Sequence, residues 1–82
     1  MYDTKYEMSD VTVDATGLFC PEPVFRTKIA IEKMHAGQTI EVSADDPAAE
    51  DDITRWANRN GHQMVEMKKD GETLTFVIKK VK

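Results

Sequence analysis

Residues 17–23, Gly-Leu-Phe-Cys-Pro-Glu-Pro, join a short strand pattern to the first helical pattern and hold the only cysteine of the 82-residue chain. A residue before proline is pushed toward extended backbone, so Cys20 should lie at the helix N-cap or beside it, not inside the helix. Pro21 then falls at the first helical position, where its fixed φ suits the helix. The stretch therefore predicts a strand-to-helix junction that presents a cysteine at the helix start.

The position of Cys20 favours a reactive thiol over a packed one. A lone cysteine is most often a small buried hydrophobe, but a cysteine in a turn before a helix lies where functional residues concentrate. The free N–H groups of Glu22 and Val24 and the positive end of the helix dipole favour a thiolate. The carboxylate of Glu22 opposes ionisation, so the sequence leaves the sign of the net pKa shift open.

Composition limits the classes of protein that this chain can belong to. Its length predicts one small domain, residues 10–82, after a polar and aperiodic tail, residues 1–9, that we expect to be disordered. A net charge of −4 argues against direct binding to nucleic acid. The chain has no bilayer-spanning apolar run and no signal-peptide pattern, so we expect a cytoplasmic protein without a membrane partner. A single cysteine excludes an internal disulfide and a multi-cysteine metal site.

Hydrophobic periodicity predicts six elements in the order βαβαββ. They are strand 11–14, helix 21–36, strand 38–44, a helix that starts at Pro47 with Asp46 as its N-cap, and strands 62–69 and 72–81 joined at Asp70-Gly71. Each helix has one apolar stripe and each strand one apolar face. These patterns predict an α/β (α+β) two-layer sandwich, with a four-stranded mixed sheet and both helices on one face.

The same patterns predict which side chains point inward. We expect Val65 and Met67 to face the same side as Phe76 in the hairpin, and Trp56 to be buried under the second helix. The first βαβ unit brings both strand-to-helix junctions to one edge of the sheet. Cys20 and the Asp45-Asp46 turn should therefore be neighbours in space.

A longer stretch around the first junction, residues 14–24, resembles the signature of the TusA/SirA/YedF family of small sulfur-transfer proteins. That family carries a Cys-Pro-x-Pro motif after an Asp…Gly turn, and the matching positions here are Asp14, Gly17, Cys20, Pro21, Glu22 and Pro23. The resemblance continues through residues 37–39 and 44–48 and covers nearly the whole chain after the tail. The Glu-Pro form of the motif and the Asp-Asp-Pro-Ala turn most resemble the TusA branch.

The resemblance implies a sulfur carrier, a sulfurtransferase-like protein that holds a persulfide on Cys20. It implies a cysteine desulfurase or rhodanese-like donor and a downstream acceptor protein. In the TusA branch the end product is 2-thiouridine in tRNA, whereas other members serve sulfur oxidation, molybdenum-cofactor assembly or selenium metabolism. The residues themselves fit a carrier, because the chain has no second cysteine that could resolve a persulfide internally.

Two surfaces near Cys20 are candidates for partner binding. The first is a small apolar patch on the outward side of the first helix, and the second is the acidic start of the second helix. Exposed apolar residues are common and acidic residues often only cap a helix, so a purely structural interpretation of each surface remains open. The residues concerned are Phe25, Arg26 and Ile29 in the patch, and Asp45, Asp46 and Glu50 in the acidic turn.

Two other classes of function remain alternatives. In a non-catalytic interaction or regulatory module, Cys20 and its prolines would only brace the helix start while Phe25 and Ile29 bind the partner. In a thiol oxidoreductase a resolving cysteine would be expected, and the chain has none. We expect a monomer without a cofactor, and no metal site, because no histidine or cysteine joins the acidic cluster.

Overall fold

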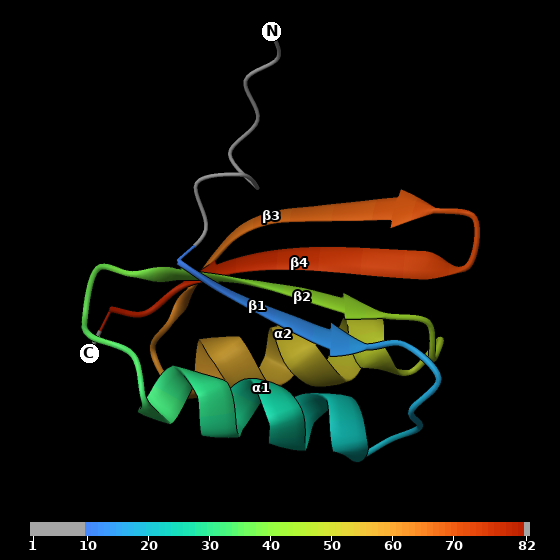
Figure 1. The fold of residues 1–82 in the computed structure, drawn as a ribbon, viewed down its shortest axis with the longest axis horizontal. Coiled ribbons are helices and arrows are strands. Elements are labelled where there is room, and N and C mark those ends of the chain that lie inside the picture. The colour runs from blue at the N-terminus through green and yellow to red at the C-terminus, as the bar shows by residue number, and fades with distance from the viewer. Residues whose placement is uncertain (1–9, 82) are drawn as a thin grey trace, which may run out of the picture.

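The structure, a computed structural model, describes residues 10–81, so the predicted disordered tail at residues 1–9 lies outside the described residues. The order βαβαββ is confirmed (Figure 1). The elements are β1 (Val11–Ala15), α1 (Glu22–Glu32), β2 (Thr39–Ala44), α2 (Ala49–Arg59), β3 (Gln63–Asp70) and β4 (Thr73–Lys79).

The four strands form one mixed sheet in the order β1-β2-β4-β3. Strands β1 and β2 are parallel and joined through α1, whereas β4 is antiparallel to both β2 and β3. Both helices cover the same face of the sheet (Figure 1), which confirms the predicted two-layer architecture. Because β1 and β2 are parallel, their carboxyl ends and the starts of both helices lie at one edge of the sheet. In the part of the chain that the structure describes, no helix is long and apolar enough to span a membrane.

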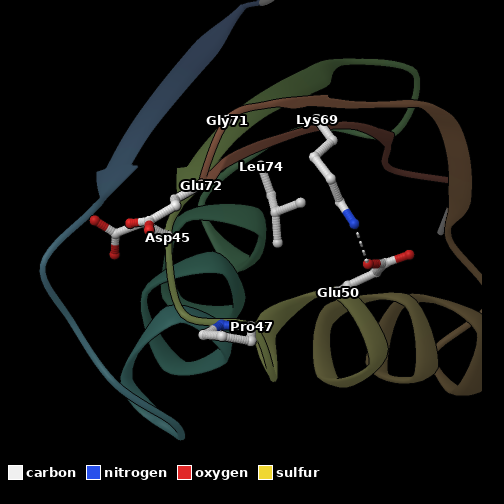
Figure 2. Close-up of a pocket in the computed structure, with 7 residues that line it drawn as sticks. All are labelled: Asp45, Pro47, Glu50, Lys69, Gly71, Glu72 and Leu74. Atoms are coloured by element: carbon white, nitrogen blue, oxygen red, sulfur yellow. Dashed lines mark ion pairs between the residues drawn. The ribbon is translucent and has the colours of Figure 1, made fainter.

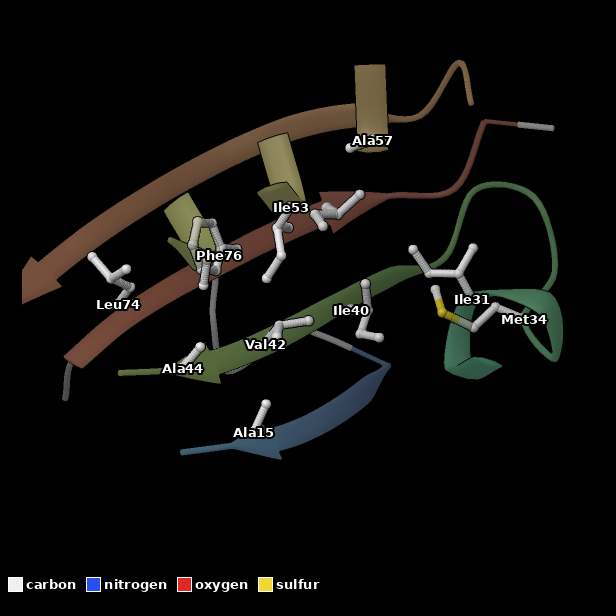
Figure 3. Packing of buried hydrophobic residues seen from close by; sticks show 12 residues of the cluster. Ala15, Ile31, Met34, Ile40, Val42, Ala44, Ile53, Ala57, Leu74 and Phe76 are labelled. Carbon is white, nitrogen blue, oxygen red and sulfur yellow. The ribbon is translucent and has the colours of Figure 1, made fainter. Parts of the chain in front are cut away.

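The core lies between the sheet and the two helices (Figure 3). The predicted inward residues of β2 are buried, because alternate side chains of a strand point to the same face. The fully buried residues include Ile40, Val42 and Ala44 of β2, Phe76 and Ile78 of β4, and Ile53 and Ala57 of α2. This continuous core fixes the positions of the two helix starts relative to each other.

Both helices begin later than predicted. Pro21, predicted at the first helical position, is the N-cap of α1, and Ala48 takes the N-cap of α2 that was predicted for Asp46. The α1 helix also ends at Glu32 and not at residue 36. In its last turn the Lys33 N–H donates to the carbonyl oxygen of Ala30, three residues earlier, as in a 3₁₀-helix.

The side chain of Lys80 binds the end of α1. Its Nζ atom donates hydrogen bonds of 2.8 and 2.7 Å to the carbonyl oxygens of Ile31 and Met34. These carbonyls belong to the last helical turn and to the residues just after it, where intrahelical donors run out. A cation from the far end of the chain therefore caps the helix.

The predicted inward position of Val65 is wrong, because a β-bulge interrupts β3 between Met64 and Glu66. Met64 pairs with Ile78 and packs against the core, whereas Val65 lines a hollow with Val77 on the opposite face of the sheet. The inserted residue shifts the alternation by one position, so Met67, beyond the bulge, lies opposite Phe76 as predicted. The predicted hairpin is confirmed, but its two-residue loop is Gly71-Glu72 and not Asp70-Gly71, because Asp70 ends β3 opposite Thr73. Gly71 has a φ of 63°.

Trp56 is half-buried, although the helical stripe predicted a buried side chain. The central stripe of α2 consists of Ala49, Ile53 and Ala57, each four residues apart. Trp56 precedes Ala57 by one residue and so lies about 100° around the helix, at the margin of the stripe. Its ring lies against the His62 ring, with a centroid distance of 5.5 Å and an interplanar angle of 39°.

Candidate functional site

Cys20 lies in the loop between β1 and α1, and its thiol is exposed. The loop leaves the strand through a tight turn in which the Leu18 N–H donates to the Ala15 carbonyl oxygen at 3.3 Å. Gly17 adopts a φ of 82°, a backbone conformation that side chains with a Cβ rarely tolerate. The backbone therefore turns sharply before Cys20 and presents the thiol at the edge of the sheet.

The two aspartates of the β2–α2 turn hold this loop in place. Asp45 accepts a hydrogen bond from the Gly17 N–H at 2.9 Å, and Asp46 accepts one from the Cys20 N–H at 2.7 Å. The second carboxylate oxygen of Asp46 accepts from the Ala48 N–H at 3.1 Å. Asp46 therefore fastens the cysteine loop to the start of α2 across 26 positions of sequence. The predicted proximity of Cys20 to this turn is confirmed.

Asp14 shapes the same loop from its other side. Its Oδ1 atom accepts hydrogen bonds from the Thr16 hydroxyl at 2.6 Å and from the Thr16 N–H at 3.0 Å. The side-chain bond and then the backbone bond hold the pKa of the Asp14 carboxyl below its ordinary value. Asp14 and Gly17 of the family motif thus form a turn that the carboxylates of Asp14 and Asp45 stabilise.

The carboxylates around Cys20 raise the pKa of its thiol. The largest cause is the hydrogen bond to Asp52, followed by desolvation and by the negative charges of Asp52 and Asp46. The helix donors that favour a thiolate are not all available, since the Glu22 N–H donates to the Phe19 carbonyl oxygen at 2.9 Å. In the isolated protein, Cys20 is therefore a protonated thiol over a wider pH range than an ordinary cysteine.

The remaining motif residues build the start of α1. Pro21 is the N-cap, Pro23 is buried against the core, and Glu22 is exposed in the first turn. Glu22 also forms an ion pair of 3.5 Å with Arg26, one turn along the helix. Exposed pairs of this kind contribute little to stability. The motif prolines therefore set the direction in which the helix leaves the cysteine loop.

The residues of the predicted apolar patch are exposed. The exposed fraction of the side chain is 53% for Phe25 and 51% for Ile29. Sequence reasoning missed Phe19, which is 74% exposed and lies next to Cys20 in the chain. Its position directly before the cysteine in a predicted loop was the available signal. Sequence reasoning also did not single out Asp52, although it belongs to the acidic start of the second helix.

A groove lies beside the β2–α2 turn, and its volume is about 520 Å³. Figure 2 shows its walls, with Asp45 and Pro47 from the turn, Glu50 from α2 and Lys69 from β3. Lys69 forms an ion pair of 3.6 Å with Glu50 across the groove. The third carboxylate is Glu72 in the hairpin turn, so the groove carries more negative than positive charge. The residues predicted to bind partners therefore lie on two sides of the cysteine loop, Phe25 and Arg26 on one and Glu50 on the other.

Comparisons with known proteins identify the family. The family model described as Sulfurtransferase TusA matches residues 11–80. A protein of Archaeoglobus fulgidus, named provisionally as a sulfur carrier protein, is 51% identical over 72 residues, which are 85% of this chain and 92% of that protein. The Sulfur carrier protein TusA of Allochromatium vinosum is 38% identical over 71 residues, covering 87% of this chain and 93% of its own.

A solved structure shares the fold. The crystal structure of a SirA-like protein from Desulfitobacterium hafniense superposes with a TM-score of 0.76 at 31% sequence identity. The match covers 88% of this chain and 99% of that protein. The family match spans β1 to β4, including the cysteine loop and the aspartate turn that holds it. The chain belongs to the sulfurtransferase TusA family.

Proposed function

We propose that the protein is a sulfur carrier that holds a persulfide on Cys20 and passes the outer sulfur from a donor protein to an acceptor protein. The observation that carries the proposal is the exposed thiol of Cys20 on a loop whose backbone Asp45 and Asp46 hold in place. Membership of the sulfurtransferase TusA family supports the same chemistry. A loop that is fixed while its thiol is exposed suits a group that must meet two partners in turn.

The transfer needs no external oxidant. In loading, the Cys20 thiolate attacks the outer sulfur of a donor persulfide, a new S–S bond forms on Cys20, and the donor leaves as a thiolate. In unloading, an acceptor thiolate attacks the outer sulfur on Cys20, and Cys20 leaves as a thiolate. The chain has no other cysteine, so the persulfide leaves only when a thiol of another molecule attacks it. A carrier with a free thiol works in a reducing compartment, which favours the cytoplasm.

The acidic surroundings of Cys20 add a requirement for the donor. Attack needs the thiolate, but Asp52 and Asp46 raise the pKa of the thiol. A donor that brings positive charge to this edge would offset the two carboxylates and lower the pKa of Cys20. We therefore propose that Asp45, Asp46 and Glu50 contribute to a docking surface for basic groups. Asp45 and Asp46 would do so in addition to holding the cysteine loop.

The apolar side of the junction completes the proposed docking surface. Phe25 and Ile29 present exposed apolar side chains near the cysteine loop, with Arg26 between them. An exposed apolar patch of this kind is typical of a protein-binding surface. We propose a cysteine desulfurase or a rhodanese-like protein as the donor class, a downstream sulfur-acceptor protein as the acceptor, and tRNA 2-thiouridine synthesis as the pathway, as the resemblance to the TusA branch implies.

A loading experiment tests the proposal. The purified protein is incubated with a cysteine desulfurase and free cysteine, and the intact mass is measured before and after treatment with a reductant. We expect the mass of one sulfur atom to be gained and then removed by the reductant, whereas Cys20→Ser gains none. Equal labelling of both proteins, or of neither with several desulfurases and rhodaneses, would contradict the proposal and favour an interaction module.

A further inference from the structure

Strand β1 is an edge of the sheet, so one side of its backbone has no neighbouring strand within the described residues. The Lys80 N–H donates to the Gln38 carbonyl oxygen at 2.9 Å, so the even-numbered residues of β2 bond to β4 and the odd-numbered ones, such as Glu41, bond to β1. Glu41 lies opposite Thr12 in the parallel register and therefore bonds to Val11 and Val13, whereas the N–H and C=O groups of Thr12 and Asp14 point outward. An edge of this kind is a template for a further strand.

A groove runs along this edge, between β1 and α1, and its volume is about 720 Å³. Four residues of α1 that are three or four positions apart form one of its walls, because such residues share one side of a helix. They are Arg26, Ile29, Ala30 and Lys33. The apolar pair therefore lies in the middle of the wall, with one cation at each end.

The charges of the groove differ from those of the whole chain. The chain has 15 acidic and 11 basic residues, yet the groove is lined by two cations, Arg26 and Lys33, and one carboxylate, Asp14. The carboxylate of Asp14 already accepts two hydrogen bonds from Thr16. The groove thus favours an occupant with negative charges at two points and an apolar group between them.

We infer that an extended segment of a partner protein, with the pattern acidic-x-apolar-x-acidic, adds to β1 as a fifth strand and lies in the groove along α1. Arg26 and Lys33 are seven residues apart, about 10 Å along the helix. Two acidic residues separated by three others in a strand face the same side and lie about 13 Å apart. The long Arg and Lys side chains bridge this difference, and the central apolar residue then covers Ile29.

The inference rests on the proposed function, which requires a partner protein to bind beside Cys20. The β1 edge ends at Ala15, whose carbonyl oxygen accepts from the Leu18 N–H, and the cysteine loop follows directly. A partner strand paired with β1 would therefore pass the carboxyl end of β1, next to the loop that holds Cys20. The backbone bonds supply affinity, and the Arg26 and Lys33 positions supply selectivity for acidic residues.

The test uses the isotopically labelled full chain and a synthetic peptide, Thr-Glu-Thr-Val-Thr-Glu-Thr, extended by a flexible Gly-Ser linker that ends in cysteine. A mixed disulfide with Cys20 holds the peptide at an effective concentration of about millimolar or above. We expect amide exchange of Thr12 and Asp14 to slow by about tenfold or more, while that of Val13, which already bonds to β2, stays unchanged. The peptide with lysine in place of glutamate should give no protection.

Two variants of equal charge change serve as controls. Lys33→Glu should abolish the protection, whereas Lys28→Glu, on the same helix but outside the groove, should not. Absence of protection at Thr12 and Asp14 with the glutamate peptide would overturn the inference. Protection without any peptide, with a doubled mass in light scattering, would assign the edge to a second copy and also overturn it. The disulfide serves only as a tether, so a protein that fails to carry sulfur would leave this result unaffected.

Discussion

Replacement of Asp46 by alanine should weaken the fold and at the same time make Cys20 more reactive. Asp46 is 9% exposed and accepts hydrogen bonds from the Cys20 N–H at 2.7 Å and from the Ala48 N–H at 3.1 Å. Its charge is also one of the causes that raise the pKa of the Cys20 thiol. Loss of the carboxylate therefore removes a structural support and an electrostatic penalty together.

The size of the stability loss follows from the two hydrogen bonds. A hydrogen bond to a charged group contributes about 1.5–3 kcal/mol, so the pair could contribute about 3–6 kcal/mol. Burial of the carboxylate costs part of this, and Cys20 and Ala48 are exposed, so their freed N–H groups bond to water. We expect a loss of about 2–3 kcal/mol in the free energy of unfolding, which lowers the urea midpoint by about 2–3 M if m is about 1 kcal/mol/M.

Urea unfolding followed by circular dichroism measures the loss, and alkylation of Cys20 as a function of pH measures the reactivity. The matched control is Asp51→Ala, an exposed residue of the same helix start whose side chain makes no hydrogen bond within the described residues, and its midpoint should be unchanged. An Asp46→Ala protein that unfolds at the same midpoint as the control would refute the role of Asp46 in holding the loop. An alkylation inflection that moves to higher pH would refute the electrostatic argument.

Three further predictions follow from the same geometry. Asp52→Asn should move the alkylation inflection of Cys20 to lower pH, because the bond to Asp52 is the largest cause of the raised thiol pKa, and an unchanged inflection would contradict this. Phe76→Ala should cost about 3–5 kcal/mol in urea unfolding because the ring is fully buried, whereas Phe25→Asp should leave folding unchanged and slow sulfur transfer. Asp45→Lys should lower the association rate with the donor in stopped-flow measurements, with a smaller difference from the wild type at high salt, where charges are screened. Equal differences at low and high salt would contradict the docking role.

The fold could be predicted from local patterns because strand alternation and helical stripes are clear over most of the chain. The alternation at Ile40, Val42 and Ala44 leaves one face for the core, and all three side chains are buried as predicted. The error at Val65 has a physical cause, since a bulge depends on how two strands pair and the pattern within one strand does not reveal it. Trp56 lies at the margin of its stripe, where a helical period alone does not decide burial.

The candidate site could be located from the sequence but not described in detail. The proximity of Cys20 to the aspartate turn followed from the parallel βαβ topology and is confirmed. Asp46 was predicted as a helix N-cap because capping rules are local, whereas its main partner lies 26 positions away. The sign of the pKa shift of Cys20 also depends on Asp52, whose distance from the thiol is set by packing of the two helix starts.

A relay experiment with isotopically labelled sulfur tests the central claim most directly. The protein is loaded by a cysteine desulfurase with labelled cysteine, separated from the desulfurase, and then mixed with a rhodanese that has a free active-site cysteine. We predict that the label leaves Cys20 and appears on the rhodanese in equal amount, and that Cys20→Ser protein delivers none. Label that stays on Cys20 in the presence of this and other acceptor thiols would contradict the account, as would equal delivery by the Cys20→Ser protein.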